Sequence, residues 1–427
     1  MWSRSLVLAA LLCLSLAHIH DKYTGYSVYT VWPEDESQLD SINRLVEELS
    51  LDVWQKGSPQ GHPARVMLSP DQKTQVLATL DRNEISHEME IADVASQLKK
   101  EDAELHSYRS SRTNRKAFED YPRYAEVNAY MADLAARHPS VVTLETIGQS
   151  YEGRDINYLK LSTSNFADSS KPVIFLDATI HAREWVTAPT VLYGLHRLLD
   201  EPTDDDRWIL DNLDWIILPI VNPDGYEYSH EHDRMWRRTR SLNRFVTTEC
   251  LGVDGNRNFD VMWNTTGVSQ DPCSPNYPGG EPFSEPETRY VRDLIHEHIE
   301  RMYFYMNIHS HGNYVLYPFG DGRNPPEAEK VHFVGAAMGA EMDARKLEQA
   351  GYYLVGNSAR MLYGTSGSAQ DYAAQEGVPL AYTLELPGLG YQFQVPPTFI
   401  NQINMETWHG LAKAAKLTRM LWDIRNR

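Results

Sequence analysis

Apolar and polar residues follow one another along the chain in blocks that predict strands alternating with helices. Mostly apolar runs are typical of strands buried on both faces, and they lie at 172–180, 215–221, 302–308 and 378–386. Shorter strands are predicted over 141–147 and 156–161, and apolar residues recur at helical spacing over 123–137, 187–199, 287–300 and 399–424. This pattern predicts an α/β fold with a mixed, largely parallel sheet flanked by helices.

The N-terminal part of the chain has shorter elements and predicts a separate small domain. Two strand–helix units suit a small α/β sandwich, with strands over 23–32 and 64–68 and helices over 37–51 and 70–80. A connecting helix is expected over 91–105. The stretch from Tyr108 to Lys116 then concentrates basic and small polar residues, which favours an exposed domain boundary. We therefore expect domains at 18–112 and 113–427.

Residues 1–17 have the features of a secretory signal peptide. Arg4 precedes an apolar run from Leu6 to Leu14, and Ser15 and Ala17 supply small residues near the expected cleavage point. A buried N-terminal helix is the alternative. The run is too short to span a membrane, and no later segment is long and apolar enough to do so. We expect a secreted, extracellular protein that is a monomer with no membrane partner.

Composition and charge narrow the function classes. The chain has 427 residues, 42% of them apolar, which is enough to bury a substantial core. Its formal net charge is −19. Proteins that bind nucleic acids need a basic surface that displaces counterions from phosphates, so we expect no nucleic-acid partner.

Removal of residues 1–17 leaves Cys250 and Cys273 as the thiols of the mature chain. In an oxidising compartment one local disulfide is expected, worth about 3 kcal/mol in the chain-entropy model. Two zinc-binding thiolates are the alternative, although the spacing lacks the usual C-x-x-C form. Between the two cysteines, Asn264 opens an Asn-Thr-Thr acceptor motif for N-glycosylation.

His181 and Glu184 follow the apolar run at 172–180 directly, and His309 follows the run at 302–308. Sites in open α/β sheets are built at the carboxyl ends of the strands, so we expect these side chains at one edge. Two imidazoles and a carboxylate suit a catalytic Zn²⁺ that keeps an open position. Ordinary surface or helix-capping residues are the alternative for so short a motif.

Hydrolysis at a metal also needs a base for the attacking water and positive charge for the oxyanion. Glu385 interrupts the apolar run at 378–386, where an unpaired buried carboxylate is costly. It therefore either faces a site or forms an ion pair in the core. The arginines of 234–240 and Arg257 can bind a substrate carboxylate bidentately, and ordinary surface pairing is the alternative.

The basic stretch after the first domain offers Arg109, Arg112 and Arg115 to a trypsin-like activating protease. Exposed polar segments between domains are preferred sites of proteolysis. An uncleaved, solvated linker is the alternative. Because a separate N-terminal domain on a secreted hydrolase suits an inhibitory prosegment, we expect cleavage in this stretch.

These motifs resemble those of the zinc metallocarboxypeptidases of the pancreatic carboxypeptidase A/B type, which are secreted as procarboxypeptidases. The resemblance runs from the prosegment to the C-terminus. The matching motifs are Tyr151-Glu-Gly-Arg, His181-Ala-Arg-Glu-Trp, Asn222-Pro-Asp-Gly, Trp236-Arg, Asp254-Gly-Asn-Arg-Asn, Ile308-His-Ser, Tyr363 and Thr383-Leu-Glu-Leu. The resemblance implies an eight-stranded sheet, a prosegment that covers the cleft until it is cleaved, one Zn²⁺ per chain, and a disulfide between Cys250 and Cys273.

The resemblance also implies a role for each site residue. A set of two His and one Glu is the ligand set of carboxypeptidase A itself, and it maps to His181, Glu184 and His309. Glu385 becomes the general base for water at the zinc, and Arg237 the group that stabilises the oxyanion. The residues that bind the substrate's terminal carboxylate are Asn256, Arg257 and Tyr363, with Arg183 further out. Asp254 is expected to orient His181.

Specificity is expected to depend on Gln370, which stands seven residues after Tyr363 at the base of the family's specificity pocket. An aliphatic residue there favours apolar C-termini and Asp favours Lys or Arg, whereas Gln fits neither pattern. An amide cannot neutralise a buried cation, so we expect a preference for neutral side chains. A basic-residue-specific carboxypeptidase and an inactive, zinc-binding relative are the alternatives. Gly364 and His311 also depart from the family's usual residues.

Overall fold

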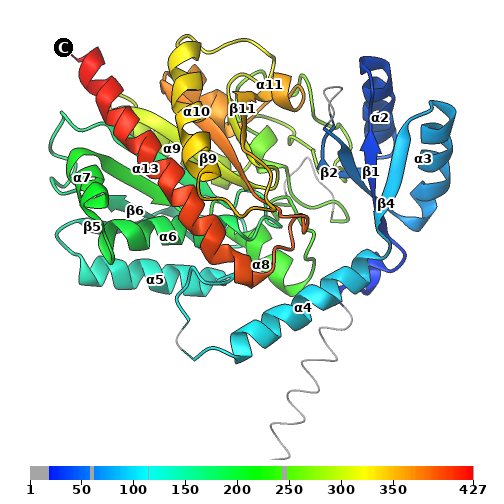
Figure 1. The fold of residues 1–427 in the computed structure, drawn as a ribbon, viewed down its shortest axis with the longest axis horizontal. Coiled ribbons are helices and arrows are strands. Elements are labelled where there is room, and N and C mark those ends of the chain that lie inside the picture. The colour runs from blue at the N-terminus through cyan, green and yellow to red at the C-terminus, as the bar shows by residue number, and fades with distance from the viewer. Residues whose placement is uncertain (1–18, 58–61, 114, 243–247, 427) are drawn as a thin grey trace, which may run out of the picture. The chain divides into compact units, whose positions relative to one another are not determined.

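The computed structural model describes residues 19–57, 62–113, 115–242 and 248–426, which form two compact units (Figure 1). One unit contains the described residues up to Thr113 together with Tyr228–Trp236, and the other contains the rest. The signal peptide predicted over 1–17 lies outside the described residues. Within the described ranges, no helix is long and apolar enough to cross a membrane.

The first unit is a small sandwich of helices on an antiparallel sheet, as the sequence predicts. Its strands have the order β2-β3-β1-β4. The apolar faces of β1 and β3 pack with α2 and α3 around a core that includes Val31, Ile42 and Val76. The elements are η1 (Asp21–Tyr23), β1 (Ser27–Trp32), α2 (Glu36–Glu48), β2 (Asp52–Gln55), β3 (Ala64–Leu68), α3 (Pro70–Arg82), β4 (Ser86–Ile91) and α4 (Val94–Ser110).

Local interactions explain where these elements depart from the predicted ranges. The strand expected from residue 23 begins at Ser27, because Gly25 adopts a left-handed φ of 79° that turns the chain. The strand β4 was not predicted, since its side chains are mostly polar and exposed. The connecting helix begins at Val94, because Asp93 caps it by accepting a hydrogen bond from the Ser96 backbone N–H at 2.7 Å.

A buried ion pair joins Tyr228–Trp236 to the N-terminal elements of the first unit. The Arg234 guanidinium donates to both carboxylate oxygens of Glu101 on α4, at 2.9 to 3.0 Å. Both side chains are buried. Burial raises the pKa of Glu101 despite the opposing charge of Arg234. Tyr23 adds a hydrogen bond from its hydroxyl to Asp233 at 2.6 Å.

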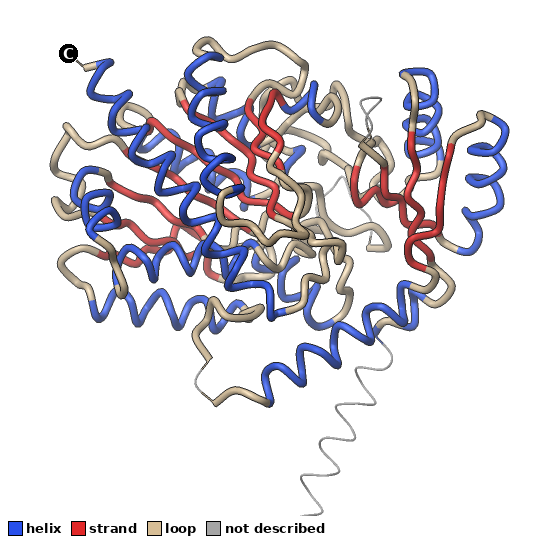
Figure 2. The backbone as a smooth tube through the Cα atoms, in the orientation of Figure 1, coloured by secondary structure: helices blue, strands red, loops and turns tan. Residues whose placement is uncertain are grey.

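The second unit is built on an eight-stranded mixed sheet with the order β11-β10-β12-β9-β7-β8-β6-β5 (Figure 2). Its central strands β12, β9, β7 and β8 are parallel, whereas β10, β6 and β5 join antiparallel. The strands are β5 (Val142–Gln149), β6 (Asp155–Leu161), β7 (Val173–Ala178), β8 (Asp214–Leu218), β9 (Met302–Ser310), β10 (Tyr314–Tyr317), β11 (Leu354–Asn357) and β12 (Leu380–Leu386). The predicted fold class is confirmed.

Helices cover both faces of this sheet. The central strands β7 and β9 are therefore buried along their whole length. Residues of α9 and α12 pack with Phe175 and Tyr305 on one face, and α6 and α13 cover the other (Figure 1). The helices of this part of the chain are α5 (Tyr124–Arg137), α6 (Thr187–Leu199), α7 (Asp204–Asn212), α8 (Pro223–Glu231), η2 (Gly255–Arg257), α9 (Pro286–His298), α10 (Ala328–Asp343), α11 (Ser358–Met361), α12 (Ala369–Gln375), η3 (Pro397–Phe399) and α13 (Ile400–Arg425).

Two predicted boundaries change for local reasons. The strand expected over 215–221 ends at Leu218, because Pro219 has no N–H to donate to a ladder. The sequence Asn222-Pro-Asp-Gly, which indicates a turn, instead begins α8. Pro223 suits a first helical position, and the side-chain oxygen of Asn222 accepts from the Gly225 N–H at 2.9 Å.

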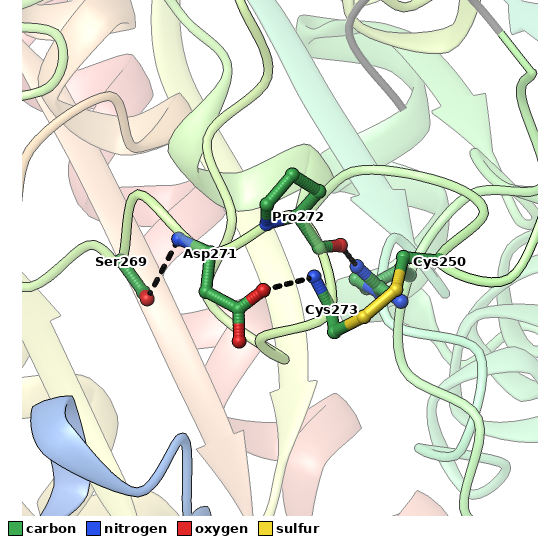
Figure 3. Close-up of a disulfide and its surroundings, with 6 residues drawn as sticks. Cys250, Ser269, Asp271, Pro272 and Cys273 are labelled. Carbon is green, nitrogen blue, oxygen red and sulfur yellow. Dashed lines mark hydrogen bonds between the residues drawn. A yellow bond between two sulfur atoms is a disulfide. The ribbon is translucent and has the colours of Figure 1, made fainter. Parts of the chain in front are cut away.

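The disulfide between Cys250 and Cys273 is present, with the two Cα atoms 4.6 Å apart (Figure 3). Asp271 supports it by accepting a hydrogen bond from the Cys273 backbone N–H at 2.9 Å. This confirms the predicted pairing. Asn264, which lies in the closed loop, is partly exposed.

Candidate metal centre and active site

The central parallel strands bring the predicted metal ligands to one edge of the sheet. His181 and Glu184 follow β7, and His309 lies near the end of β9, its neighbour in the sheet. The strand was expected to end at residue 308 but continues to Ser310, so His309 lies inside it, at the position before the last. All three side chains are buried, and one ligand atom from each lies within 4.8 Å of the others.

The donor atoms of these residues fit a bound cation. The two Nδ1 atoms of His181 and His309 lie 3.0 Å apart, and the Glu184 carboxylate oxygens lie 2.8 and 3.0 Å from them. Lone pairs that converge so closely are stable when a shared positive ion lies between them. Two imidazole nitrogens and a carboxylate oxygen form a set typical of catalytic zinc.

Hydrogen bonds on the far side of each imidazole leave its Nδ1 available for a metal. His181 Nε2 contacts the Asp254 carboxylate at 2.9 Å, so this nitrogen carries the proton. His309 Nε2 contacts the Asn307 side-chain oxygen in the same way. Burial lowers the pKa of His309, which favours the neutral ring that a metal requires.

Glu184 and Asp254 supply the negative charge of the centre. Burial alone raises the pKa of a carboxyl group, but His181 and His309 outweigh it and lower the pKa of Glu184. Arg237 and His181 likewise outweigh burial and hold the pKa of Asp254 well below its usual value. Both carboxyl groups therefore stay ionised. Glu184 needs this charge to bind a metal ion.

Arg237 lies beside the predicted ligands. Its guanidinium donates to Asp254 at 3.0 and 3.2 Å and lies 3.7 Å from the Glu184 carboxylate. The Ala182 N–H donates to the Arg237 backbone oxygen at 3.0 Å, which ties the arginine loop to the ligand loop. The structure thus brings the expected positive group to the centre.

Glu385 lies next to His309 in the parallel pairing of β12 with β9. Burial, together with the charge of Glu184, raises the pKa of Glu385 well above its usual value, although Arg237 and Arg257 oppose this shift. No salt bridge within 4.0 Å joins its carboxylate to a cation among the described residues. The ion pair in the core, one of the two alternatives left by the sequence, is therefore not seen among the described residues, and the role of Glu385 as a base stays a prediction.

The residues predicted to bind a terminal carboxylate form a connected group on and around η2. Arg257 is buried and donates to the Tyr363 hydroxyl at 3.0 Å and to the Asn256 backbone oxygen at 2.7 Å. The side-chain nitrogen of Asn256 lies 3.2 Å from His309 Nε2, and its oxygen accepts from the Ala369 N–H at 2.8 Å. These contacts bring Asn256, Arg257 and Tyr363 together beside the metal ligands.

Gln370 and Arg183 are also buried, in different surroundings. Gln370 lies on α12 next to Ala369, and its side-chain oxygen has no hydrogen-bond partner within the described ranges. Arg183 is 1% exposed, and its guanidinium lies 4.5 Å from the centroid of the Phe393 ring. The side chain of Arg183 therefore does not lie at an open surface, where its predicted contact with substrate would place it.

Sequence reasoning missed three buried polar residues behind His309: Asp177, Tyr305 and Asn307. A signal was present, because Tyr305, Asn307 and His309 stand at alternate positions of a strand that is otherwise apolar. Their connection to Asp177 depends on the pairing of β7 with β9, which the sequence does not give.

Comparison with known proteins identifies the family. A model described as zinc carboxypeptidase matches residues 127–410, and one described as carboxypeptidase activation peptide matches residues 29–101. The chain is 39% identical to carboxypeptidase B of Helicoverpa zea, over 96% of this chain and 97% of that protein. It is 31% identical to carboxypeptidase A1 of Bos taurus, over 95% and 96%.

A solved structure, carboxypeptidase A from Helicoverpa armigera, matches with a TM-score of 0.89 and 38% identity, over 93% of this chain and 98% of that chain. The chain belongs to the zinc carboxypeptidase family. It is made with an activation peptide, as a proenzyme.

Proposed function

We propose that this protein is a secreted, monomeric exopeptidase that removes neutral C-terminal residues from peptides and proteins after a trypsin-like protease has cleaved its prosegment. We assign residues 1–17 to the signal peptide, 18–112 to the prosegment and 113–427 to the catalytic domain. One observation carries the activity: the convergence of His181, Glu184 and His309 with Glu385 at one edge of the sheet. We also propose Asn264 as a glycosylation site.

The chemistry follows from the groups around the ligands. Zinc, when bound by His181, Glu184 and His309, lowers the pKa of a nearby water and polarises the scissile carbonyl. Glu385 accepts the proton of the attacking water and passes it to the leaving amine. Arg237 donates N–H groups to the developing oxyanion.

Recognition of a terminal carboxylate follows from Asn256, Arg257 and Tyr363. When His309 binds a metal through Nδ1, its Nε2 carries a proton, so the Asn256 side-chain nitrogen 3.2 Å away faces another donor. That amide group is therefore poised to donate to an acceptor from the substrate. Pairing of a carboxylate with Arg257 would place only the last peptide bond at the metal, which makes the enzyme an exopeptidase.

The preference for neutral residues rests on Gln370. A cationic side chain placed against a buried, uncharged amide would lose its hydration without gaining a counter-charge, at a cost of several kcal/mol. One observation favours the basic-residue alternative. Asp371, the next residue, is buried, and one of its carboxylate oxygens has no partner within the described ranges. Burial raises the pKa of Asp371 to about 7, which weakens this alternative in neutral solution.

The test is to activate the proenzyme with trypsin and to measure kcat/KM on peptides that differ only in a C-terminal Leu, Phe, Gln, Lys or Arg. We expect release to require zinc, to stop with a chelator and to return when zinc is restored. We expect neutral residues to be favoured over Lys and Arg by roughly 10²-fold. A reversed preference would establish the basic-residue enzyme instead.

The variant Glu385→Gln separates an enzyme from a binding protein. It keeps the shape of the side chain but cannot accept a proton, so we expect kcat to fall by about 10³-fold with zinc still bound. A wild-type protein that binds zinc yet releases no residue from any peptide would contradict the proposal and establish an inactive, zinc-binding relative.

A further inference from the structure

Three polar side chains stand in a row on one face of β9. Tyr305, Asn307 and His309 occupy alternate positions, so they project from the same face of the strand. On the neighbouring strand β7, Asp177 lies directly opposite Asn307 in the parallel pairing. The four side chains are buried, beside apolar core residues such as Phe175. Polar groups in such surroundings are costly unless they are bonded to each other.

Hydrogen bonds connect the row to the metal centre. The Tyr305 hydroxyl donates to one carboxylate oxygen of Asp177 at 2.5 Å. The Asn307 side-chain nitrogen donates to the other oxygen of the same carboxylate. The Asn307 side-chain oxygen in turn contacts Nε2 of His309. A continuous chain of contacts therefore runs from the sheet core to a predicted metal ligand.

An ionised Asp177 sets the direction of each hydrogen bond in this chain. An ionised carboxylate can only accept, so Asn307 must turn its nitrogen toward Asp177 and its oxygen toward His309. An oxygen in that position accepts, so Nε2 of His309 must carry the proton. The remaining nitrogen, Nδ1, then has a free lone pair, and it is the atom that lies 3.0 Å from His181 Nδ1 and from Glu184.

We propose that Asp177, Asn307 and Tyr305 are positioning residues that fix the tautomer and the ring orientation of His309 for metal binding. The inference rests on the metal site of the proposed function. Each of the two histidines is then oriented by a carboxylate. Asp254 contacts His181 directly, whereas Asp177 acts on His309 through the amide of Asn307. Burial raises the pKa of Asp177 to about 7, against the effect of its two hydrogen bonds, so the carboxyl is ionised at pH 8.

The first test is Asn307→Leu, which keeps the volume of the side chain but removes both hydrogen bonds. We expect the zinc affinity of the full-length protein at pH 8, measured by competition with a chelator, to fall by about 10- to 100-fold. We also expect the visible absorption of the Co²⁺-substituted protein to shift, because the ring of His309 is no longer held. After activation and at saturating zinc, kcat should fall while KM stays within about twofold.

A charge exchange provides the rescue. Asn307→Asp alone places two carboxylates face to face, and Asp177→Asn alone removes the group that orients the amide. The double variant restores one carboxylate and one amide in exchanged positions, with an acceptor still facing His309. We expect each single variant to lose zinc affinity and the double variant to return to within about threefold of the wild type.

The control is Tyr382→Phe, to be compared with Tyr305→Phe. The Tyr382 hydroxyl is equally buried on the adjacent strand β12, but it donates to the Val331 backbone oxygen at 2.8 Å and not to the row. We expect Tyr305→Phe to lower zinc affinity by less than tenfold and Tyr382→Phe to leave it unchanged. Equal zinc affinities and cobalt spectra for Asn307→Leu and Tyr382→Phe would overturn the positioning role. Unchanged affinity in His309→Ala would instead overturn the metal site itself.

Discussion

Asp254 contacts both a candidate metal ligand and a neighbouring arginine, one with each carboxylate oxygen. One of its oxygens contacts His181 and accepts from the Asn256 N–H at 3.0 Å, and the other accepts from Arg237. One buried carboxylate thus neutralises Arg237 and holds a candidate metal ligand. The guanidinium can therefore lie 3.7 Å from Glu184 in the interior without an uncompensated charge.

Arg237 is expected to act on the transition state more than on the bound substrate. In Arg237→Ala the oxyanion loses a charged donor, so kcat should fall by about 10²- to 10³-fold while KM changes by less than tenfold. Steady-state kinetics on a C-terminal Leu peptide would measure both values, with zinc content checked in parallel. Arg292→Ala, which removes an arginine paired with Asp293 on α9, is the control and should leave kcat unchanged. Equal losses in both variants would contradict the assignment.

The three candidate ligands were predictable from the sequence, because His181 and Glu184 directly follow one apolar run and His309 directly follows another. The contacts of Asn307 were not predictable, since they depend on a partner 130 residues away on β7. The stacking of Arg183 on Phe393 was equally hidden, because the two residues lie far apart in the chain.

At the scale of elements, apolar runs predicted the central strands well because β7, β8 and β9 are buried on both faces. The two strands at the β11 side of the sheet were harder to predict. The short strands β10 and β11 have four residues each, and the chain around them offers no long apolar run. The helix α8 was missed because a Pro-Asp-Gly sequence serves equally well in a turn and at a helix start.

The buried carboxyl group of Glu406 on α13 makes the stability of the folded protein depend on pH. It is buried, and the Tyr353 hydroxyl donates to it at 3.2 Å. Burial raises the pKa of Glu406 to about 7, from 4.5. Because the folded state holds the proton more tightly than the unfolded state, stability is full below pH 4.5 and falls as the pH rises to about 7. The loss amounts to about 3 kcal/mol for this group.

The variant Glu406→Gln removes this loss. We expect the wild type to become less stable relative to the variant between pH 5 and pH 8, as measured by the midpoint of thermal unfolding at each pH. Glu329→Gln on α10, an exposed position, is the control and should follow the wild type. A constant difference between Glu406→Gln and the wild type at every pH would contradict the shift.

For the whole molecule, the structure distinguishes the three arginines at the predicted cleavage segment. Arg109 lies in the last turn of α4, and Arg115 is held by ion pairs with Asp120 and Glu126. Arg112 is exposed and lies outside the helix. Proteases act on exposed, irregular backbone, so we expect trypsin to cleave after Arg112.

Intact mass measurement after brief trypsin treatment would identify the new N-terminus, which should be Thr113. In Arg112→Gln we expect activity to develop at least about tenfold more slowly, whereas Arg115→Gln should develop it at the wild-type rate. Rapid activation of Arg112→Gln would show that another bond is cut first.

We expect that cleavage alone does not separate the prosegment, because Glu101 and Arg234 lie on opposite sides of the proposed cut and are paired in the intact chain. Loss of one partner of a buried ion pair typically costs about 3–5 kcal/mol, since the other charge is left uncompensated. We therefore expect the cleaved prosegment of Glu101→Gln to dissociate faster than that of the wild type, as followed by size-exclusion chromatography after trypsin. Glu104→Gln on the same helix removes only an exposed contact with Lys100 and should dissociate at the wild-type rate. If both variants behave alike, the buried pair does not hold the prosegment, and its release is governed by the cut itself.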